Sequence, residues 1–297
     1  MSLPTFTGTI PALVTPFTRD NRVNVTVLQE LVDYLLARRV HGFYLCGTTS
    51  EGAFMTVEER QLIVETVVKR VNGRVPVFVQ VGAVAVTDAI RLAQHARACG
   101  ASGISSILPP VLYDERGIVA YYTAVAEAVP NVPFFPYLFD GKQDTLALMR
   151  NLLHIPNLVG AKYTGPNMYE LGHLAALRKE GWTIFAGMDE QLVCALMFGA
   201  RANIGSTVNL MPGAHRAIHT SYLNGDVMGA LALQKRINRV IDCLLHFGLA
   251  GSLKVALGFL GFDCGEPRIP NLPLPEHRRE ELRAALQAAD FFDLAAM

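Results

Sequence analysis

The sequence has few of the features that mark membrane-spanning, disulfide-linked or nucleic-acid-binding proteins. No apolar run approaches the roughly 20 residues that a helix needs to cross a bilayer. The 26 basic and 26 acidic side chains balance, so no net charge attracts nucleic acid or an anionic membrane. The five cysteines are odd in number and form no Cys-x-x-Cys pair, which indicates reduced thiols. Together with an N-terminus that shows no secretory signal, these absences predict a cytoplasmic protein without nucleic-acid or membrane partners.

Lysine is also scarce, and only one lysine follows a strand-like run. Lys162 ends the apolar run Leu158–Lys162, whereas the other five lie in helical stretches or in a polar turn (Lys69, Lys179, Lys235, Lys254 and Lys142). An amine held against apolar neighbours loses hydration, which disfavours its charged form and makes it a nucleophile for ketones. A lysine that only caps a strand and points into water is the commoner case. The other residues of the predicted site therefore decide between the two interpretations.

Eight short runs rich in Val, Ile and Phe alternate with helical patterns. The predicted strands are Ile10–Val14, Phe43–Cys46, Val75–Val81, Gly103–Ile107, Val132–Tyr137, Leu158–Lys162, Thr183–Ala186 and Ala202–Ser206. Their nearly continuous apolar character fits parallel strands that are covered on both faces. Eight strand-then-helix units predict an α/β fold, the closed (β/α)8 barrel.

Helical patterns lie between these runs and continue after the last of them. The predicted helices include Val25–Arg39, Thr56–Val71, Thr87–Ala98, Val227–Phe247, Ser252–Leu260 and Glu276–Ala289. Thr56 and Glu59 have the spacing of a capping box. We therefore predict a barrel over residues 1–225 and a helical extension over residues 226–297 that packs on it. The alternative, a doubly wound open sheet, is disfavoured because no Gly-x-Gly-x-x-Gly follows any strand.

In such a barrel, chemistry gathers at the C-terminal ends of the strands. The polar residues expected there are Thr48, Thr49, Tyr137, Lys162, Thr164, Asp189, Glu190 and Ser206, together with Gly187. Each has a purely structural explanation as a turn, a core aromatic or an acidic helix N-terminus. Their joint occurrence on one face favours a catalytic site.

These residues supply the parts that a Schiff-base enzyme acting on a 2-keto acid needs. Lys162 is the amine that attacks the ketone. Thr48 and Thr49, with their backbone N–H groups beside the small Gly47, form a cradle for the substrate carboxylate. Tyr137, one strand away from the amine, is the candidate proton shuttle, assisted by a threonine hydroxyl.

The same motifs carry a family resemblance. Gly47-Thr48-Thr49-x-Glu51, the tyrosine after strand five and the Gly-x-Lys162 of strand six resemble the dihydrodipicolinate synthase / N-acetylneuraminate lyase family of pyruvate-dependent class I aldolases. The resemblance extends from Gly8-x-x-Pro11-Ala12-x-x-Thr15-Pro16-Phe17 to the helical tail. It implies a (β/α)8 barrel, a pyruvate Schiff base on Lys162, no cofactor, and a homotetramer.

The later motifs are more similar to the N-acetylneuraminate lyase branch. That similarity implies that Thr164, Gly187, Asp189, Glu190 and Ser206 bind the hydroxyls of the substrate, for which carboxylates and a serine are suited. The dihydrodipicolinate branch typically has an arginine in the loop after the strand-five tyrosine. Residues 138–144 read Leu-Phe-Asp-Gly-Lys-Gln-Asp and contain no arginine.

Three departures from the family pattern leave the aldehyde half of the substrate open. Ser50 replaces a glycine, and a positive φ there would strain the turn by roughly 1–2 kcal/mol. The loop after Tyr137 is shorter than usual, and Val111 stands where a tyrosine is common, with Tyr113 close by.

We predict a class I lyase that cleaves N-acetylneuraminate or a related 2-keto-3-deoxy sugar acid. The alternatives are dihydrodipicolinate synthesis from pyruvate and aspartate semialdehyde, and a catalytically silent barrel that binds a keto acid. We expect no metal, because His215 and His219 lack the acidic partner of a His-Glu-x-x-His site.

Overall fold

The computed structural model describes residues 5–108, 114–139, 144–178 and 180–297, in which eight strands form one parallel sheet. They are β1 (Gly8–Pro11), β2 (Phe43–Leu45), β3 (Val77–Gln80), β4 (Gly103–Ile107), β5 (Phe134–Phe139), β6 (Gly160–Thr164), β7 (Thr183–Ala186) and β8 (Ala202–Gly205). Their order is β1-β8-β7-β6-β5-β4-β3-β2. A parallel bridge between Ala12 and Tyr44, with the amide of Leu13 donating to the Tyr44 carbonyl at 2.9 Å, joins the two ends of the sheet. The predicted barrel is confirmed.

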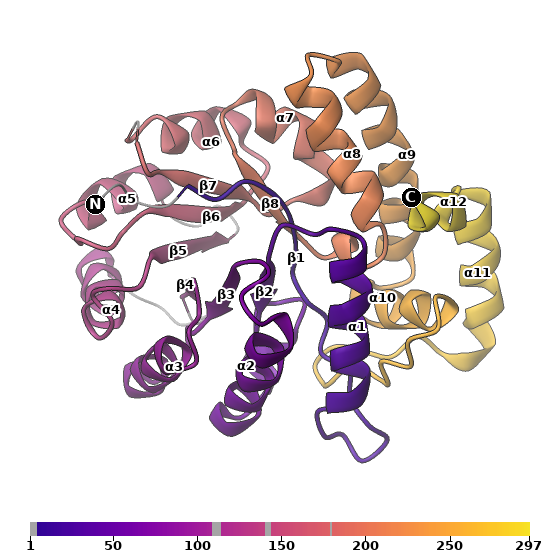
Figure 1. Ribbon diagram of the computed structural model, residues 1–297, viewed down its shortest axis with the longest axis horizontal. Coiled ribbons are helices and arrows are strands. Elements are labelled where there is room, and N and C mark those ends of the chain that lie inside the picture. Colours follow the sequence, from indigo (N-terminus) through magenta and orange to yellow (C-terminus); the bar gives the residue numbers. More distant parts are fainter. Residues whose placement is uncertain (1–4, 109–113, 140–143, 179) are drawn as a thin grey trace.

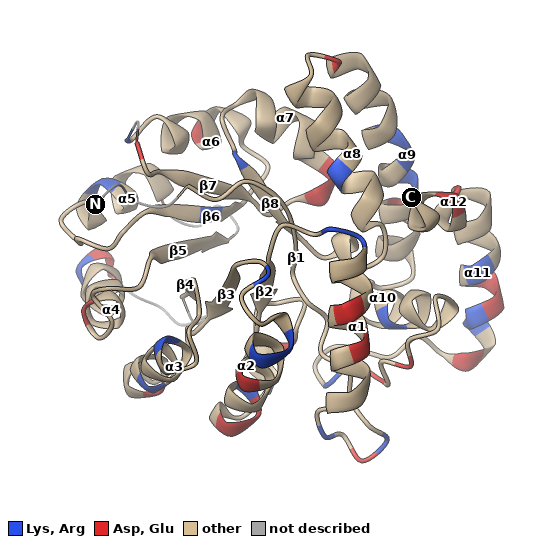
Figure 2. Ribbon diagram, viewed as in Figure 1, with Lys and Arg blue, Asp and Glu red and all other residues tan. Residues whose placement is uncertain are grey.

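Helices surround this barrel (Figure 1). The helices that follow the strands are α1 (Val25–Ala37), α2 (Val57–Val71), α3 (Val86–Ala98), α4 (Glu115–Glu127), α5 (Thr145–Leu152), α6 (Met168–Ala175), α7 (Leu192–Met197) and α8 (Pro212–Leu223). Short 3-10 helices lie in the loops after β2, β7 and β8, at η1 (Gly52–Phe54), η2 (Asp189–Gln191) and η3 (Thr207–Asn209). The predicted capping box is confirmed, since Thr56 and Glu59 exchange hydrogen bonds at the start of α2. Figure 2 shows that most charged residues lie on the surrounding helices and loops.

Several predicted strand bounds are wrong by up to three residues, as for β1, which was predicted at Ile10–Val14 and lies at Gly8–Pro11. In β5 and β6 the difference changes the position of the site. Tyr137 and Lys162 were both expected at strand ends, but β5 continues to Phe139 and β6 to Thr164. The residues that follow them are aromatic, aliphatic or β-branched, which favours a continued strand. Tyr137 and Lys162 are therefore paired in register inside the sheet rather than in the loops above it.

Aromatic side chains fill the N-terminal part of the barrel interior. They belong to the buried cluster inside the barrel, which consists of Ile10, Ala12, Tyr44, Phe78, Phe135, Tyr137, Val159, Phe185, Ala202 and Ile204 and reaches the cavity at Ala12, Tyr137 and Ile204. The rings of Phe78, Phe135 and Phe185 meet edge to face with centroids 5.0 to 5.9 Å apart. The ring of Phe6, just before β1, lies 4.8 Å from that of Phe78. This packing leaves the C-terminal face as the side on which a substrate reaches the barrel.

The C-terminal extension packs beside α8. It contains α9 (Val227–His246), α10 (Leu249–Phe259), η4 (Glu276–Arg278), α11 (Arg279–Ala288) and α12 (Phe291–Ala296). Figure 1 shows these helices on the side of the barrel where α8 and α1 lie. The predicted division at residues 225/226 falls in the turn between α8 and α9, and as a domain boundary it stays a prediction. Within the described ranges no single helix is long and apolar enough to cross a bilayer, and α9 with α10 reaches that length only as a pair bent by 118°.

Candidate active site

Lys162 lies in the middle of β6, beside Tyr137 of β5 and Phe185 of β7. Its side chain is 4% exposed. The amine Nζ donates a hydrogen bond to Oγ1 of Thr164 at 3.2 Å and lies 3.6 Å from the centroid of the Tyr137 ring. The prediction of an amine shielded from bulk water is confirmed.

Tyr137 connects this amine to the loop after β2. Its hydroxyl lies 3.5 Å from Oγ1 of Thr48. Burial by itself would raise the pKa of Tyr137, but the charge of Lys162 and hydrogen bonds from Lys162, Thr48 and Thr164 outweigh it, and the pKa is lowered. A phenol with a lowered pKa gives up its proton more readily, as a proton shuttle must.

The loop that carries Thr48 and Thr49 is tied to β8 and to β1. The hydroxyls of Thr49 and Ser206 lie 2.6 Å apart. The buried hydroxyl of Ser50 donates to the carbonyl of Leu13 at 2.5 Å. The left-handed residues of this loop are Cys46 and Glu51, with φ of 57° and 62°, and not Ser50. The strain considered for a serine at this position therefore does not arise, and Ser50 instead holds the loop against the segment after β1.

Asp189 and Glu190 begin η2, at the C-terminal end of β7. The Oδ2 atom of Asp189 accepts hydrogen bonds from the amide and the hydroxyl of Thr207, at 2.8 and 2.7 Å. The Thr207 hydroxyl also lies 3.0 Å from Nε2 of the buried His215. Glu190 is partly buried, and burial raises the pKa of its carboxyl. Oδ2 of Asp189 is thus already engaged inside the protein, whereas the carboxyl of Glu190 lines the cavity wall.

Gly187 is required by the close approach of β6 and β7. A Cβ atom at this position would lie 1.8 Å from Oγ1 of Thr164, the hydroxyl that accepts from Lys162. A larger residue would displace that hydroxyl from the amine. Gly187 therefore keeps space at the floor of the site.

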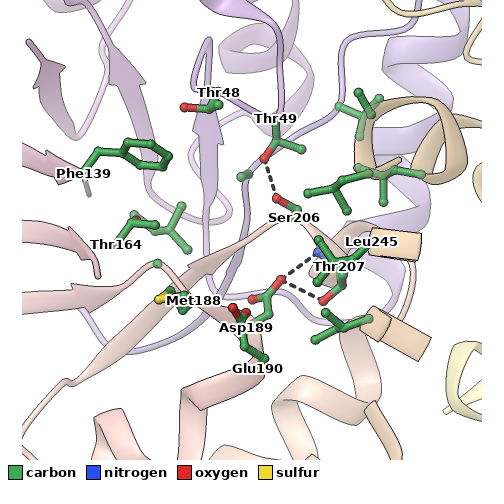
Figure 3. Close-up of a pocket in the computed structure, with 18 of the residues that line it drawn as sticks. Thr48, Thr49, Phe139, Thr164, Met188, Asp189, Glu190, Ser206, Thr207 and Leu245 are labelled. Atoms are coloured by element: carbon green, nitrogen blue, oxygen red, sulfur yellow. Dashed lines mark hydrogen bonds between the residues drawn. The ribbon is translucent and has the colours of Figure 1, made fainter. Parts of the chain in front are cut away.

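All nine residues predicted from the sequence line one cavity of about 320 Å³. They are Thr48, Thr49, Tyr137, Lys162, Thr164, Gly187, Asp189, Glu190 and Ser206. Figure 3 shows Thr49 and Ser206 joined across the middle of the pocket, with Thr164 to one side and Asp189 and Glu190 below. The structure brings the predicted residues together, while their separate roles stay predictions.

Two groups of cavity residues were not found from the sequence. Glu51 and Lys254 form a buried ion pair at 2.8 Å in its wall. A set of apolar side chains also lines it, namely Phe139, Met188, Ile241, Leu245, Leu249, Ala250 and Leu253. The helical periodicity of residues 227–260 predicted an apolar face, but it did not indicate that this face reaches the cavity. Val111, Tyr113, Lys142 and Lys179 lie outside the described residues.

The two histidines of α8 bind neutral partners. Nε2 of His219 lies 3.0 Å from Oδ1 of Asn203. Nε2 of His215 lies 3.0 Å from the hydroxyl of Thr207. Within the part of the chain that the structure describes, no group of three or more His, Cys, Asp or Glu side chains is placed to hold a metal ion.

A buried lysine beside a tyrosine in a (β/α)8 barrel is an arrangement suited to Schiff-base chemistry. The match to a family model and the relatives described below show that this chain is an enzyme of the class I aldolase and lyase class. More particularly, it belongs to the Dihydrodipicolinate synthetase family, whose model matches residues 5–289.

Individual relatives agree with this assignment and carry two names. The N-acetylneuraminate lyase of Rhizobium meliloti (strain 1021) is 31% identical over 283 residues, which cover 94% of each chain. The 4-hydroxy-tetrahydrodipicolinate synthase of Thermoanaerobacter sp. (strain X514) is 28% identical over 291 residues, with 96% of this chain and 97% of that protein covered. The structure of Proteus mirabilis N-acetylneuraminate lyase superposes with a TM-score of 0.92 at 29% identity, over 97% of this chain and 100% of that one.

Proposed function

We propose that the protein cleaves a 2-keto-3-deoxy acid to pyruvate and an aldehyde through a Schiff base on Lys162. The first candidate substrate is N-acetylneuraminate or a related sugar acid. The observation that carries the proposal is the amine of Lys162, which is buried beside the Tyr137 ring and the Thr164 hydroxyl at the floor of the cavity.

The proposed reaction begins when the uncharged Nζ of Lys162 attacks C2 of the keto acid and water is lost to give an iminium. The iminium accepts the electron pair of the C3–C4 bond while a base takes the proton of the C4 hydroxyl, which releases the aldehyde. The enamine is then protonated at C3, and hydrolysis returns pyruvate and the free lysine. Tyr137 is the proposed proton carrier, because the centroid of its ring lies 3.6 Å from Nζ of Lys162 and its hydroxyl lies 3.5 Å from Oγ1 of Thr48.

The cradle for the substrate carboxylate is assigned to Thr48 and Thr49. Their loop lies beside Tyr137, and the hydrogen bond of Thr49 with Ser206 holds it in place. On the aldehyde side, Thr164, Gly187, Asp189, Glu190 and Ser206 are the proposed binding residues. Hydroxyl groups near C4 are suited to such acceptors.

Dihydrodipicolinate synthesis is the second candidate, because a relative of that name matches this chain almost as well as the lyases do. The arginine expected of that branch is missing from residues 138–144, which disfavours it. Consumption of aspartate semialdehyde with pyruvate, at a rate above the cleavage of any 2-keto-3-deoxy acid, would favour this candidate instead.

The proposal requires no cofactor, because the covalent iminium supplies the electron sink. It also includes a homotetramer located in the cytoplasm, without nucleic-acid or membrane partners. Sedimentation of the purified protein tests the assembly, and cell fractionation tests the location.

Reduction with borohydride in the presence of pyruvate tests the mechanism. We expect a covalent mass gain that peptide mapping assigns to Lys162. Lys254 is an internal control, because it is the other lysine that lines the same cavity among the described residues. Lys162→Ala should show no trapped adduct and no turnover while keeping the circular dichroism of the wild type. Well-folded wild-type protein without an adduct would leave a silent keto-acid-binding barrel as the explanation.

A further inference from the structure

The cavity has two kinds of wall. Hydroxyl groups from Thr48, Thr164 and the Tyr137 phenol lie around the Lys162 amine. The second wall is apolar, and α9 and α10 of the C-terminal extension contribute Ile241, Leu245, Leu249, Ala250 and Leu253 to it. Figure 3 shows Phe139 and Met188 on one side of the pocket and Leu245 on the other.

Apolar side chains also continue outward from the amine along β5. The ring of Phe139, the last residue of β5, meets the Tyr137 ring edge to face with centroids 5.8 Å apart. Phe139 is 51% exposed, and Leu245, in the last turn of α9, is 54% exposed. Large apolar side chains that are left open at the edge of a cavity indicate a surface that an apolar group covers.

Most polar side chains of the cavity wall are already paired with one another, as Glu51 is with Lys254 and with Asn271, while Oδ1 of Asp189 has no partner. The Ser206 hydroxyl is engaged with Thr49, and Oδ2 of Asp189 is engaged with Thr207. The carboxylate of Glu190 is partly buried in the wall and is suited to one or two hydroxyls near C4. A chain that carries a hydroxyl on every carbon would place its outer hydroxyls against leucine side chains, where they would lose water without gaining a partner.

We propose that the preferred substrate carries an apolar chain or ring, and not a polyhydroxyl chain, on the part of the aldehyde half that lies against Leu245, Leu249 and Phe139. This inference rests on the proposed Schiff-base cleavage by Lys162, but it departs from the first candidate substrate named above, because N-acetylneuraminate carries a polyhydroxyl chain. The substrate class is a 4-hydroxy-2-keto acid that is polar next to the cleaved bond and hydrocarbon-like beyond it.

The experiment measures aldol addition of pyruvate to three aldehydes, namely hexanal, benzaldehyde and N-acetylmannosamine. We expect kcat/KM for the two apolar aldehydes to exceed that for N-acetylmannosamine by about tenfold or more. Leu245→Asn and Leu249→Asn should each lower kcat/KM for hexanal by about tenfold, mainly through a higher KM, because the contact binds substrate without taking part in the reaction. Leu223→Asn is the matched control, since Leu223 is 79% exposed at the end of α8 and does not line the cavity.

The outcomes separate this inference from the function on which it rests. Without a pyruvate adduct on Lys162, both fail. With an adduct but with N-acetylmannosamine preferred, or with the two asparagine variants behaving like Leu223→Asn, the inference alone is overturned. A third outcome also overturns it: Leu245→Asn changes the oligomeric state in sedimentation but leaves the ranking of the three aldehydes by kcat/KM unchanged. The apolar wall would then be a contact between subunits.

Discussion

Lys254 and Glu51 form an ion pair of 2.8 Å between α10 and the loop after β2, with side chains that are 3% and 2% exposed. The Lys254 amine also donates to the carbonyl of Glu266 at 3.2 Å, and Oε2 of Glu51 accepts from the amide of Arg268 at 2.6 Å. Burial lowers the pKa of Lys254, and Glu51 opposes that effect. Through this pair the C-terminal extension holds the loop that contains the proposed carboxylate cradle.

Lys254→Met should destabilise the protein strongly, because it leaves the Glu51 charge buried without its partner. We expect the free energy of unfolding to fall by about 3–5 kcal/mol in urea titrations. Lys235→Met, on the exposed side of α9, is the control and should change it by less than about 0.5 kcal/mol. The double variant Glu51→Leu/Lys254→Met should recover part of the loss, since no unpaired charge remains. Equal unfolding curves for Lys254→Met and Lys235→Met would contradict this account.

Tyr137→Phe should reduce kcat by about 10²–10⁴-fold, because it removes the proposed proton carrier. The borohydride adduct on Lys162 should still form with pyruvate, since the amine remains in place. Tyr44→Phe is the matched control, because Tyr44 is a buried neighbour whose hydroxyl donates to Ser105 at 3.2 Å. A similar loss of kcat in both variants would show that the effect comes from packing and not from proton transfer.

Ser50→Gly should destabilise the protein even though glycine is usual at this place in the family pattern. It removes the buried hydrogen bond to Leu13 and adds backbone freedom to the unfolded chain, at a cost of about 2 kcal/mol. Ser50→Ala should account for about 1 kcal/mol of this loss. Thermal unfolding of both variants separates the contribution of the hydrogen bond from that of the backbone freedom. A gain in stability for Ser50→Gly would mean that the turn is strained after all.

His219 should make the protein less stable in weak acid. Burial, and then the charges of His41 and His215, lower the pKa of His219 to about 3. Above about pH 6.5 this side chain is neutral in both the folded and the unfolded chain. As the pH falls from about 6.5 toward about 3, only the unfolded chain takes up the proton, so stability falls with decreasing pH.

From pH 7 to pH 5 this single histidine should cost about 2 kcal/mol of unfolding free energy. His219→Gln should remove that part of the pH dependence, as measured by urea midpoints at the two pH values. The exposed His277→Gln should retain the wild-type dependence. The same pH dependence in His219→Gln as in the wild type would assign the effect to His41 or to His215.

The barrel and the positions of the proposed catalytic residues follow from local patterns. Parallel strands buried on both faces need continuous apolar runs, and a barrel brings the ends of those runs to one face. Lys162, Tyr137 and the Thr48-Thr49 pair could therefore be placed near one another from their positions after such runs. The strand ends were less accurate, because residues such as Phe139 and Thr164 fit a strand as well as a loop.

The long-range contacts around the cavity could be found only in the folded chain. Nothing in the sequence near Lys254 indicates that its amine is buried against Glu51, because that contact joins segments about 200 residues apart that only the packing of α10 brings together. The same packing turns Leu245 and Leu249 toward the substrate cavity, whereas helical periodicity shows only that they share a face. The amino-acid order thus specifies which chemical groups are present at the barrel's open end. Long-range packing decides what surrounds them, and with it the shape and polarity of the cavity wall.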